Sequence, residues 1–374
     1  MDLFRKKEIN LNHTSEMKKE LKTSDLIMLG IGAIIGTGIF VVTGVAANQN
    51  AGPALSLSFV LAAIVVILSG LSFAEFASRV PVIGGPYAYL YVVFGEFAAW
   101  LTGWLLIGEF FLGAELPQAL TGGYNPENGT YIDLIAVLVV IFVTYIVSLE
   151  AKKALRLNNA MVYVKFGIIA LFIIVGIFFV KPDNWQPFMP FGFSGVLDGA
   201  ALVFFAFLGF DAVAMAAEEV KNPQKDVPRG IIGSILIATV LYIIVTLILT
   251  GIVPYTELGV NDPVAFAMRY VGHGTVGAVI AVGAILTLLT VTISMMYSLF
   301  MTEIDQKHRT PKKATYAAGV AAVFFAGFFP LNVLAELTNI MALAYLMLVS
   351  LGLLKLRKMF GKPKAGEFKV PFVP

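Results

Sequence analysis

Long apolar stretches alternate with short polar ones along almost the whole chain after its first 22 residues. A bilayer core of ~30 Å requires roughly 20 apolar residues in a helix. The pattern therefore predicts an all-α protein whose helices cross a membrane, and the polar first 22 residues carry no signal-peptide pattern. Ten segments qualify as spans, at about residues 24–46, 55–78, 88–114, 131–149, 159–180, 196–217, 230–253, 274–301, 314–331 and 338–354.

Composition supports the same interpretation. Of the 374 residues, 58% are hydrophobic and only 13% charged, and the mean hydropathy is +0.86. A soluble domain has about 45–50% apolar and about 25% charged residues. One globular core cannot bury this excess, so we exclude a soluble enzyme and predict an integral membrane protein. The chain has no cysteine, which excludes disulfides and cysteine-bound metals, and its net charge of +2 gives no indication of nucleic-acid binding.

The distribution of basic residues predicts the orientation in the membrane. Lysine and arginine gather in the N-terminal tail, in the loops after the even-numbered spans and in the C-terminal segment. The opposite side carries only Lys181 and Arg269, and Lys165 lies inside the fifth span. Under the positive-inside rule both termini are cytoplasmic, and the protein is expected in the cell (plasma) membrane.

Glycines interrupt the first span at Gly30, Gly32, Gly36 and Gly38. Each weakens a helix by about 1 kcal/mol relative to alanine. One interpretation is close packing of helices, because small residues four apart let backbones approach. The other is a helix that unwinds at Gly36–Gly38 and exposes backbone polar groups, which a membrane tolerates only beside a cavity or a ligand. Composition alone does not separate the two.

The sixth span has a matching interruption at Gly209, followed two residues later by Asp211. Spans one and six are five apart, so ten spans divide into two halves with interruptions at corresponding positions. This pattern indicates a transporter with inverted repeats. The N-terminus of a half-helix offers N–H groups that suit a carboxylate, and its C-terminus offers carbonyls that suit an ammonium. A site with both is chemically suited to an amino acid, which favours unwound helices.

Lys165 is the single lysine within a span. It follows the loop residues Asn158 and Asn159 by six to seven positions, roughly 10 Å along a helix, so its side chain could snorkel to the surface. The alternative is a buried amine that gains and loses a proton during transport. Placed against the carbonyls of the broken first helix, its ammonium would take the position of a bound cation.

Glu109 is the most isolated acid within a span. It is either functional, as a proton acceptor or as a counter-charge to a cationic substrate, or a hydrogen-bonded structural acid. Glu75 is interpreted as interfacial or structural. The three histidines lie outside the spans and far apart, so we expect no metal site. The sequence contains no nucleophile–base constellation and no nucleotide-binding loop, and we expect no cofactor.

Four sequence blocks resemble the amino acid–polyamine–organocation transporter superfamily, and in particular the bacterial relatives of cationic amino acid transporters. The similarity extends more weakly from Leu21 to Pro374. The resemblance implies a LeuT-type fold of two inverted five-helix repeats with unwound helices 1 and 6. The blocks are Gly30–Phe40, Phe73–Glu75 with Pro81–Tyr89, Phe204–Asp211 and Ala217–Gly230.

The resemblance also implies site residues. In the family, backbone N–H groups of the first break bind the substrate carboxylate, main-chain carbonyls bind its amine, and a lysine of the fifth helix replaces a coupling sodium ion. The matching positions are Gly36, Thr37 and Gly38 for the carboxylate, Ile34, Phe205, Ala206 and Leu208 for the amine, and Lys165 for proton coupling. An aromatic gate matches Phe205. Met295 would face the substrate side chain together with Glu109, and its bulk favours small substrates over arginine.

The expected organisation has four parts: a cytoplasmic N-terminal tail (1–22), a first five-helix repeat (23–182), a second repeat (183–358) and a cytoplasmic C-terminal segment (359–374). The chain also departs from the family pattern. The resemblance implies more residues near 114–115 and 301–302, and two further helices after the last residue. Residues merely omitted at these places would leave the site intact, whereas a shortened variant would alter the pocket around Glu109 and Met295.

The predicted function is a proton-coupled symporter that imports L-amino acids, such as alanine and conceivably cationic ones, by alternating access. Its expected partners are the L-amino acid, a proton and membrane lipid, with no nucleic acid; whether a small membrane subunit accompanies it stays open. One alternative is an exchanger that swaps two amino acids without net proton movement. Another is a membrane sensor that binds amino acids without transporting them. An enzyme is not expected.

Overall fold

The computed structural model describes residues 21–80, 84–113, 132, 134–149, 151–298, 312–329, 331–364 and 366–371. The described residues form helices and no strands; the one β-type contact among them is an isolated bridge between Leu21 and Val220. The long helices are α3 (Leu55–Arg79), α5 (Glu96–Gly113), α7 (Leu134–Leu149), α8 (Ala151–Gly176), α11 (Pro223–Ile252), α13 (Gly274–Ser298), α14 (Lys312–Phe328) and α15 (Leu331–Phe360).

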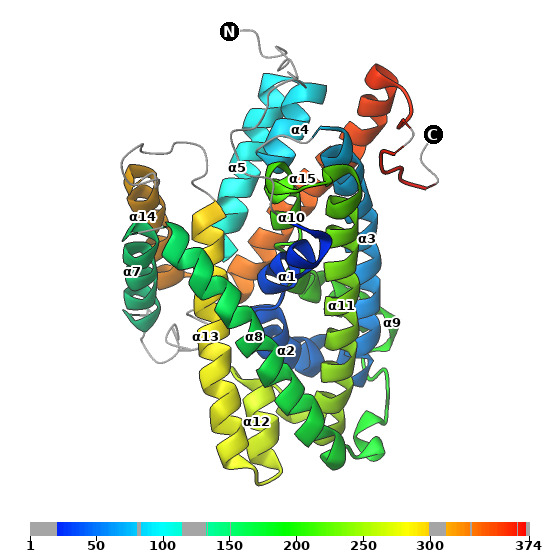
Figure 1. Cartoon of the computed structure of the whole chain (residues 1–374). Helices are drawn as coiled ribbons and strands as arrows, with labels where there is room; N and C mark the ends of the chain where they lie inside the picture. The colour runs from blue at the N-terminus through cyan, green and yellow to red at the C-terminus, as the bar shows by residue number, and fades with distance from the viewer. Residues whose placement is uncertain are drawn as a thin grey trace.

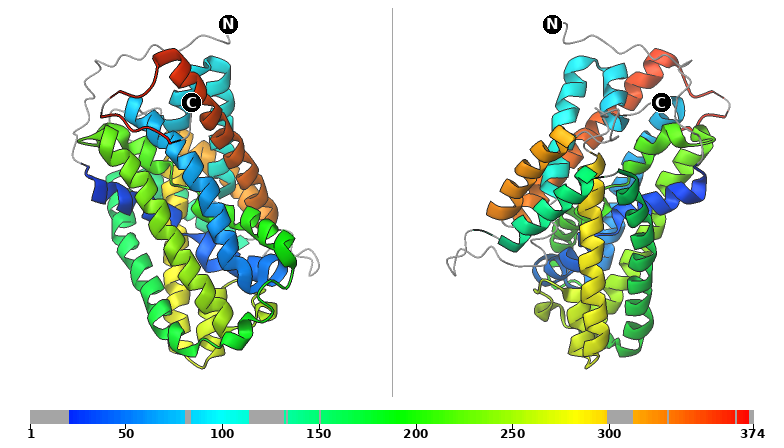
Figure 2. Two further views of the ribbon diagram at one scale, coloured as in Figure 1. Left: turned by 90° about the vertical axis from the view of Figure 1, so that its right-hand side faces the viewer. Right: turned by 60° about the vertical axis from the view of Figure 1, so that its left-hand side comes forward.

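Shorter helical pieces connect these helices. They are α1 (Thr23–Ile34), η1 (Gly38–Val42), α2 (Thr43–Ala46), η2 (Ala47–Ala51), η3 (Gly52–Ala54), α4 (Gly85–Val93), η5 (Ile177–Phe179), η6 (Pro182–Trp185), α9 (Gly192–Val203), η7 (Phe204–Phe207), α10 (Ala212–Met215), η8 (Ala216–Glu219), η9 (Tyr255–Glu257) and α12 (Pro263–Tyr270). Figures 1 and 2 show an elongated bundle in which most of the long helices run roughly along one axis, while α1 runs from the edge of the bundle toward its centre at about mid-height.

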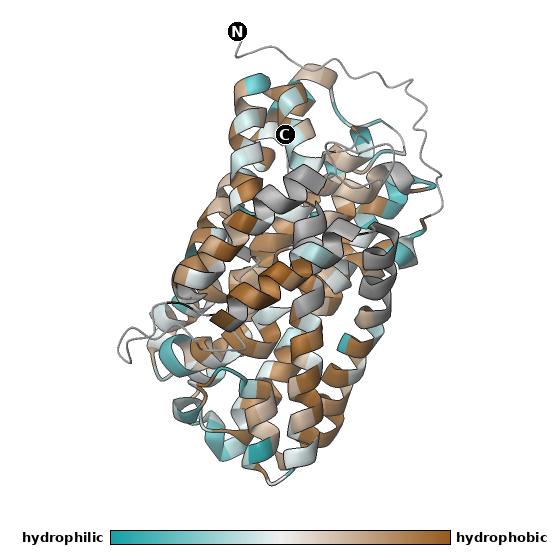
Figure 3. Cartoon of the chain, turned by 90° about the vertical axis from the view of Figure 1, so that its left-hand side faces the viewer, coloured by the Kyte–Doolittle hydropathy of each residue, from teal (hydrophilic) through white to brown (hydrophobic). Residues whose placement is uncertain are grey.

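The outer surface of the bundle is apolar. Large hydrophobic side chains face outward along the helices, among them Leu68, Phe178 and Val320. Figure 3 shows hydrophobic residues along the length of the helices and hydrophilic ones toward the two ends. Within the described residues, five helical runs are long and apolar enough to cross a membrane: Gly38–Arg79, Met161–Phe179, Gly192–Met215, Pro223–Ile252 and Val333–Phe360. Such a surface and such lengths suit lipid rather than water.

The centre of the bundle is a large hydrophobic core with aromatic contacts between helices, and a small second cluster joins α7 and α14. α11 packs along α3, α5 along α15, and α8 along α13, while α1 lies against both α11 and α8. Phe73 of α3 makes edge-on ring contacts with Tyr89 of α4, with Phe210 just before α10 and with Tyr345 of α15, at centroid distances of 6.3, 5.5 and 6.4 Å. These contacts hold the segment around residue 210 against α3, α4 and α15.

Several expected span boundaries differ from the helices. The helices α8, α11 and α15 begin seven or eight residues before the expected spans at 159, 230 and 338, and two further differences affect the fold. The segment 88–114 is not one helix, because the chain turns at Gly95, whose φ of 101° is accessible to glycine at little cost, and α5 begins only at Glu96. The tenth helix does not end near residue 354 but continues to Phe360. The additional residues include Arg357, whose guanidinium group is buried in the protein and does not belong to an exposed C-terminal tail.

An ion cluster closes the end of the bundle at which α3 and α15 finish. The carboxylate of Glu75, with no exposed surface, accepts hydrogen bonds from Arg357 Nε at 2.8 Å and Nη2 at 2.5 Å, and from the backbone N–H of Val370 at 2.8 Å. Arg357 also donates to the Val370 carbonyl. Glu75 is therefore a structural acid, which attaches the segment after α15 to α3.

Candidate functional site

Two helices break at the middle of the bundle. α1 ends at Ile34, Ile35 is extended with φ −73° and ψ 106°, and the chain becomes helical again at Gly38. The second break follows η7: Leu208 is extended with ψ 146° and Gly209 has φ +100°, and α10 begins at Ala212. Backbone N–H and C=O groups at both breaks leave the regular helical pattern, as the glycine positions predicted.

The two breaks touch each other. A Cβ added to Gly38 would collide with the backbone and the side chain of Ala206, and one added to Gly209 would lie 3.0 Å from Ala33. Gly36, Thr37 and Gly38 therefore lie directly beside the segment Phe205–Leu208. The structure brings together the residues that the resemblance assigns to the carboxylate and to the amine.

The glycines of the first span serve close packing as well. A Cβ on Gly30 would meet Ser234 of α11, one on Gly32 would meet Val162 of α8, and one on Gly36 would approach Val291 of α13 to 3.0 Å. Each glycine thus faces a different neighbour. The two interpretations of the glycine run are both correct, because the same residues allow the break and let three helices approach it.

Lys165 lies at the first break. Its side chain is only 1% exposed, and Nζ donates hydrogen bonds to the carbonyls of Gly32 at 2.7 Å and Ile35 at 3.0 Å. α8 presents Val162 and Lys165 to α1 on one face, since they are three residues apart. The side chain therefore does not snorkel. The amine occupies a cage of carbonyls at the end of a half-helix, which is a favourable place for a positive charge.

Tyr242 of α11 links the two breaks, and sequence reasoning did not identify it. Its buried hydroxyl lies 2.9 Å from the carbonyl of Ile34 and 2.8 Å from that of Ala206. A hydroxyl has one proton, so it donates to one of these carbonyls at a time. Both carbonyls belong to the predicted amine site. A polar residue in the middle of the seventh span was the available signal.

Some polar groups at the first break have no protein partner. Among the described residues, the backbone N–H of Gly36 donates to no backbone or side-chain acceptor, and the Thr37 hydroxyl, in a residue 2% exposed, makes no hydrogen bond. Buried polar groups are nearly always paired. A donor N–H and an adjacent hydroxyl suit a carboxylate. Phe205, 7% exposed, lies on the neighbouring segment.

Glu109 lies beside the second break. It is 1% exposed on α5 and interacts with Tyr345 of α15 and with Asp211, which precedes α10. Lys165 interacts with neither carboxyl. The backbone of Met295 lies in α13, but its side chain is outside the described residues, so its predicted place beside the substrate stays a prediction.

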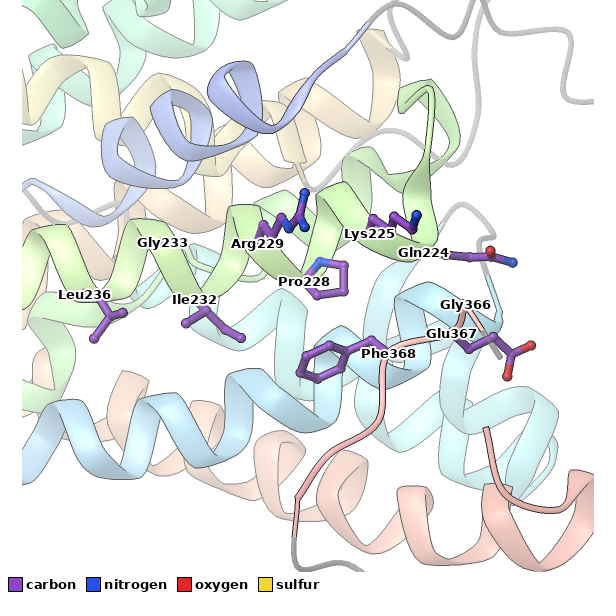
Figure 4. Close-up of a pocket in the computed structure, with 10 residues that line it drawn as sticks. All are labelled: Gln224, Lys225, Pro228, Arg229, Ile232, Gly233, Leu236, Gly366, Glu367 and Phe368. Carbon is purple, nitrogen blue, oxygen red and sulfur yellow. The ribbon is translucent and has the colours of Figure 1, made fainter. Parts of the chain in front are cut away.

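No group of three acidic or histidine side chains in the described part of the chain could hold a metal ion. A surface groove of about 490 Å³ lies at the N-terminal end of α11. Figure 4 shows its lining by Lys225, Arg229 and Ile232 of α11 on one side and by Phe368 of the segment after α15 on the other. Its lining contains no residue of either break.

Comparisons with known proteins found similar sequences. The sequence profile described as "Amino acid permease" matches residues 21–300. A methylthioribose transporter and the branched-chain amino acid permease BcaP, both of Bacillus subtilis (strain 168), are each 42% identical to this chain, with 100% of the chain and 89% of each relative covered. The human cationic amino acid transporter 4 is 31% identical over 92% of the chain and 60% of its own length.

Proposed function

Because the chain belongs to the amino acid permease family, within the amino acid–polyamine–organocation superfamily and as a relative of the cationic amino acid transporters, we propose that it imports L-amino acids together with protons. It is a multi-pass membrane protein, and transport is its family's activity rather than catalysis. Movement of the two broken helices would expose the site to each side of the plasma membrane in turn.

Recognition of the substrate would depend on its backbone. The carboxylate would bind the N–H groups of Gly36, Thr37 and Gly38, and the ammonium the carbonyls of Ile34, Phe205, Ala206 and Leu208. The unpartnered Gly36 N–H and Thr37 hydroxyl support the first assignment. The second is supported by Tyr242, whose hydroxyl lies within hydrogen-bond distance of two of these carbonyls and donates to one of them at a time.

The position of Lys165 is the main support for proton coupling. Its ammonium lies against two carbonyls of the first break, where a cation would otherwise balance their partial negative charge. Loss of the proton would remove that charge and weaken the contact of α8 with the break. A proton bound at Lys165 would thereby favour the conformation that binds the substrate.

The arrangement of helices supports the five-plus-five architecture. The breaks lie in the first and sixth expected spans, and they pack against each other in the core. We therefore place the first repeat at residues 23–182 and the second at 183–358, with both ends of the chain on the cytoplasmic side.

The substrate is proposed to be a small or branched neutral L-amino acid. One of the relatives with 42% identity is named for branched-chain amino acids and the other for methylthioribose. The bulk expected of Met295 favours such side chains over arginine.

The test is uptake of radiolabelled L-alanine and L-leucine into proteoliposomes without sodium, with and without an inward proton gradient. Accumulation that collapses on addition of an uncoupler supports proton symport. Unlabelled arginine and methylthioribose serve as competitors and define the substrate class. Uptake that requires preloaded amino acid and ignores the proton gradient would show an exchanger, and binding without any uptake would show a sensor.

A further inference from the structure

Three buried polar side chains from three different elements meet in the core beside the second break. Glu109 comes from α5, Asp211 from the turn before α10, and Tyr345 from α15. They are 1%, 1% and 0% exposed. The hydroxyl of Tyr345 interacts with both carboxyl groups, and these interact with each other. The three residues are far apart in sequence, so the fold itself assembles the cluster.

The cluster has too few hydrogen-bond donors. Glu109 Oε2, Asp211 Oδ2 and the Tyr345 hydroxyl oxygen are all buried, and none forms a well-aligned hydrogen bond with another described residue. The Tyr345 hydroxyl approaches both carboxyl groups, but its one proton can serve only one of them at a time. Buried polar atoms are nearly always paired, so the cluster requires a further donor.

The surroundings supply no positive charge. From α4, Tyr89 also interacts with Asp211, and its own hydroxyl has no partner. Lys165 is directed toward α1, and Arg357 is bound to Glu75. No other lysine, arginine or histidine in the described part of the chain forms an ion pair or hydrogen bond with Glu109 or Asp211.

Two neighbouring carboxylates in this core cannot both stay ionised without a cation. Removing one unpaired carboxylate from water is strongly unfavourable, and a like charge beside it adds to the cost. A single proton removes one of the charges. It also turns one carboxyl group into a hydrogen-bond donor, which the three unpartnered oxygens need.

We propose that Glu109 and Asp211 bind one proton between them, with Tyr345 as their third partner, at a site separate from Lys165. The pair titrates as a unit, and the proton belongs to both carboxyl groups. Glu109 is then a proton ligand together with Asp211, beyond its expected place in the substrate pocket.

The position of Asp211 connects this proton to the broken helices. Two residues earlier, Gly209 packs against Ala33 of α1, whereas Glu109 belongs to the neighbouring long helix α5. Movement of the second break relative to α5 would change the distance between the carboxyl groups of Asp211 and Glu109. Release of the proton during transport rests on the proposed function; binding of the proton in the resting protein does not.

The test is infrared difference spectroscopy of the purified protein without substrate, which detects the carbonyl stretch of a protonated carboxyl group. We expect such a band at neutral pH, and we expect Glu109→Gln and Asp211→Asn each to remove it, because each leaves one carboxylate with an amide donor. Glu96→Gln, at the start of the same helix α5, and Lys165→Met should both keep the band.

Tyr345→Phe provides a second measurement that changes no carboxyl group and little shape. It should shift the band, since a hydrogen-bonding neighbour is lost. Absence of the band in the parent protein, or its persistence in both carboxyl variants, would overturn the proposal. A band that behaves as expected in a protein without proton-driven uptake would refute the proposed function and leave the proton site intact.

Discussion

At the scale of single residues, the first break contains some polar groups that have hydrogen-bond partners and others that have none. Thr43 donates a hydrogen bond from its hydroxyl to the Ile39 carbonyl at 2.8 Å, as a threonine in a helix commonly does. Thr37, six residues earlier on the same segment, has an equally buried hydroxyl without a partner. A buried hydroxyl that contributes nothing to the resting fold is a group available to a ligand.

Thr37→Val should therefore separate stability from binding. Removal of an unpaired buried hydroxyl should leave the melting temperature unchanged or raise it. Substrate affinity should fall by about tenfold, because the variant loses one hydrogen bond to the substrate, worth about 1 kcal/mol or slightly more. Thermal unfolding in detergent and radioligand binding measure the two effects. The control, Thr43→Val, should lower stability instead, and an equal loss of stability in both variants would contradict this assignment.

At the scale of elements, the two breaks could be predicted because their causes are local. Glycines interrupt otherwise apolar spans at Gly36–Gly38 and at Gly209, and a glycine disfavours a helix whatever its neighbours are. Lys165 could be identified as a candidate site residue for a similar reason, because a charged residue within an apolar span is unusual. The turn at Gly95 was missed, since a single glycine in an apolar run gives no sign of which φ it adopts.

The partners of these residues could not be predicted, because they lie far away in sequence. Arg357 looked like part of a basic tail, yet its partner Glu75 lies 282 positions earlier. Tyr242 and Tyr345 are unremarkable tyrosines until the fold places carbonyls or carboxyls beside their hydroxyls. Local pattern identifies a residue that is unusual for its segment; it does not identify what that residue contacts.

Glu75→Gln tests the attachment of the segment after α15. In this variant the buried guanidinium of Arg357 has no counter-charge. Removal of one partner of a buried ion pair typically lowers the free energy of unfolding by about 3 kcal/mol or more. We expect a lower melting temperature and faster proteolysis after Phe360. Glu75→Met combined with Arg357→Met should recover part of the loss, because no charge then stays unpaired. A single variant as stable as the parent protein would refute the structural role of this pair.

At the scale of the whole molecule, the apolar outer surface and the positions of the basic residues predict a membrane orientation. The end at which α3 and α15 finish also contains the start of α11, where Lys225 and Arg229 lie. The other end carries Lys181 and the exposed pair of Arg269 with Asp262. The excess of positive charge at the first end predicts that it faces the cytoplasm.

This orientation can be tested without a background correction, because the chain contains no cysteine. Lys225→Cys should react with a membrane-impermeant maleimide only after the cells are permeabilised. Asp183→Cys, in η6 at the opposite end, should react in intact cells. The reverse pattern would invert the proposed topology, and labelling of both positions in intact cells would exclude it.

Proton coupling through Lys165 is the central claim, and one variant tests it most directly. Lys165→Met keeps much of the side chain's length but cannot carry a proton. In proteoliposomes with an inward proton gradient, the account predicts that this variant loses accumulation of amino acid, while exchange of labelled for unlabelled substrate persists. Lys181→Met, which changes an exposed lysine outside the core, should accumulate as the parent does. Gradient-driven accumulation by Lys165→Met at the parental level, with an unchanged dependence on pH, would contradict the account.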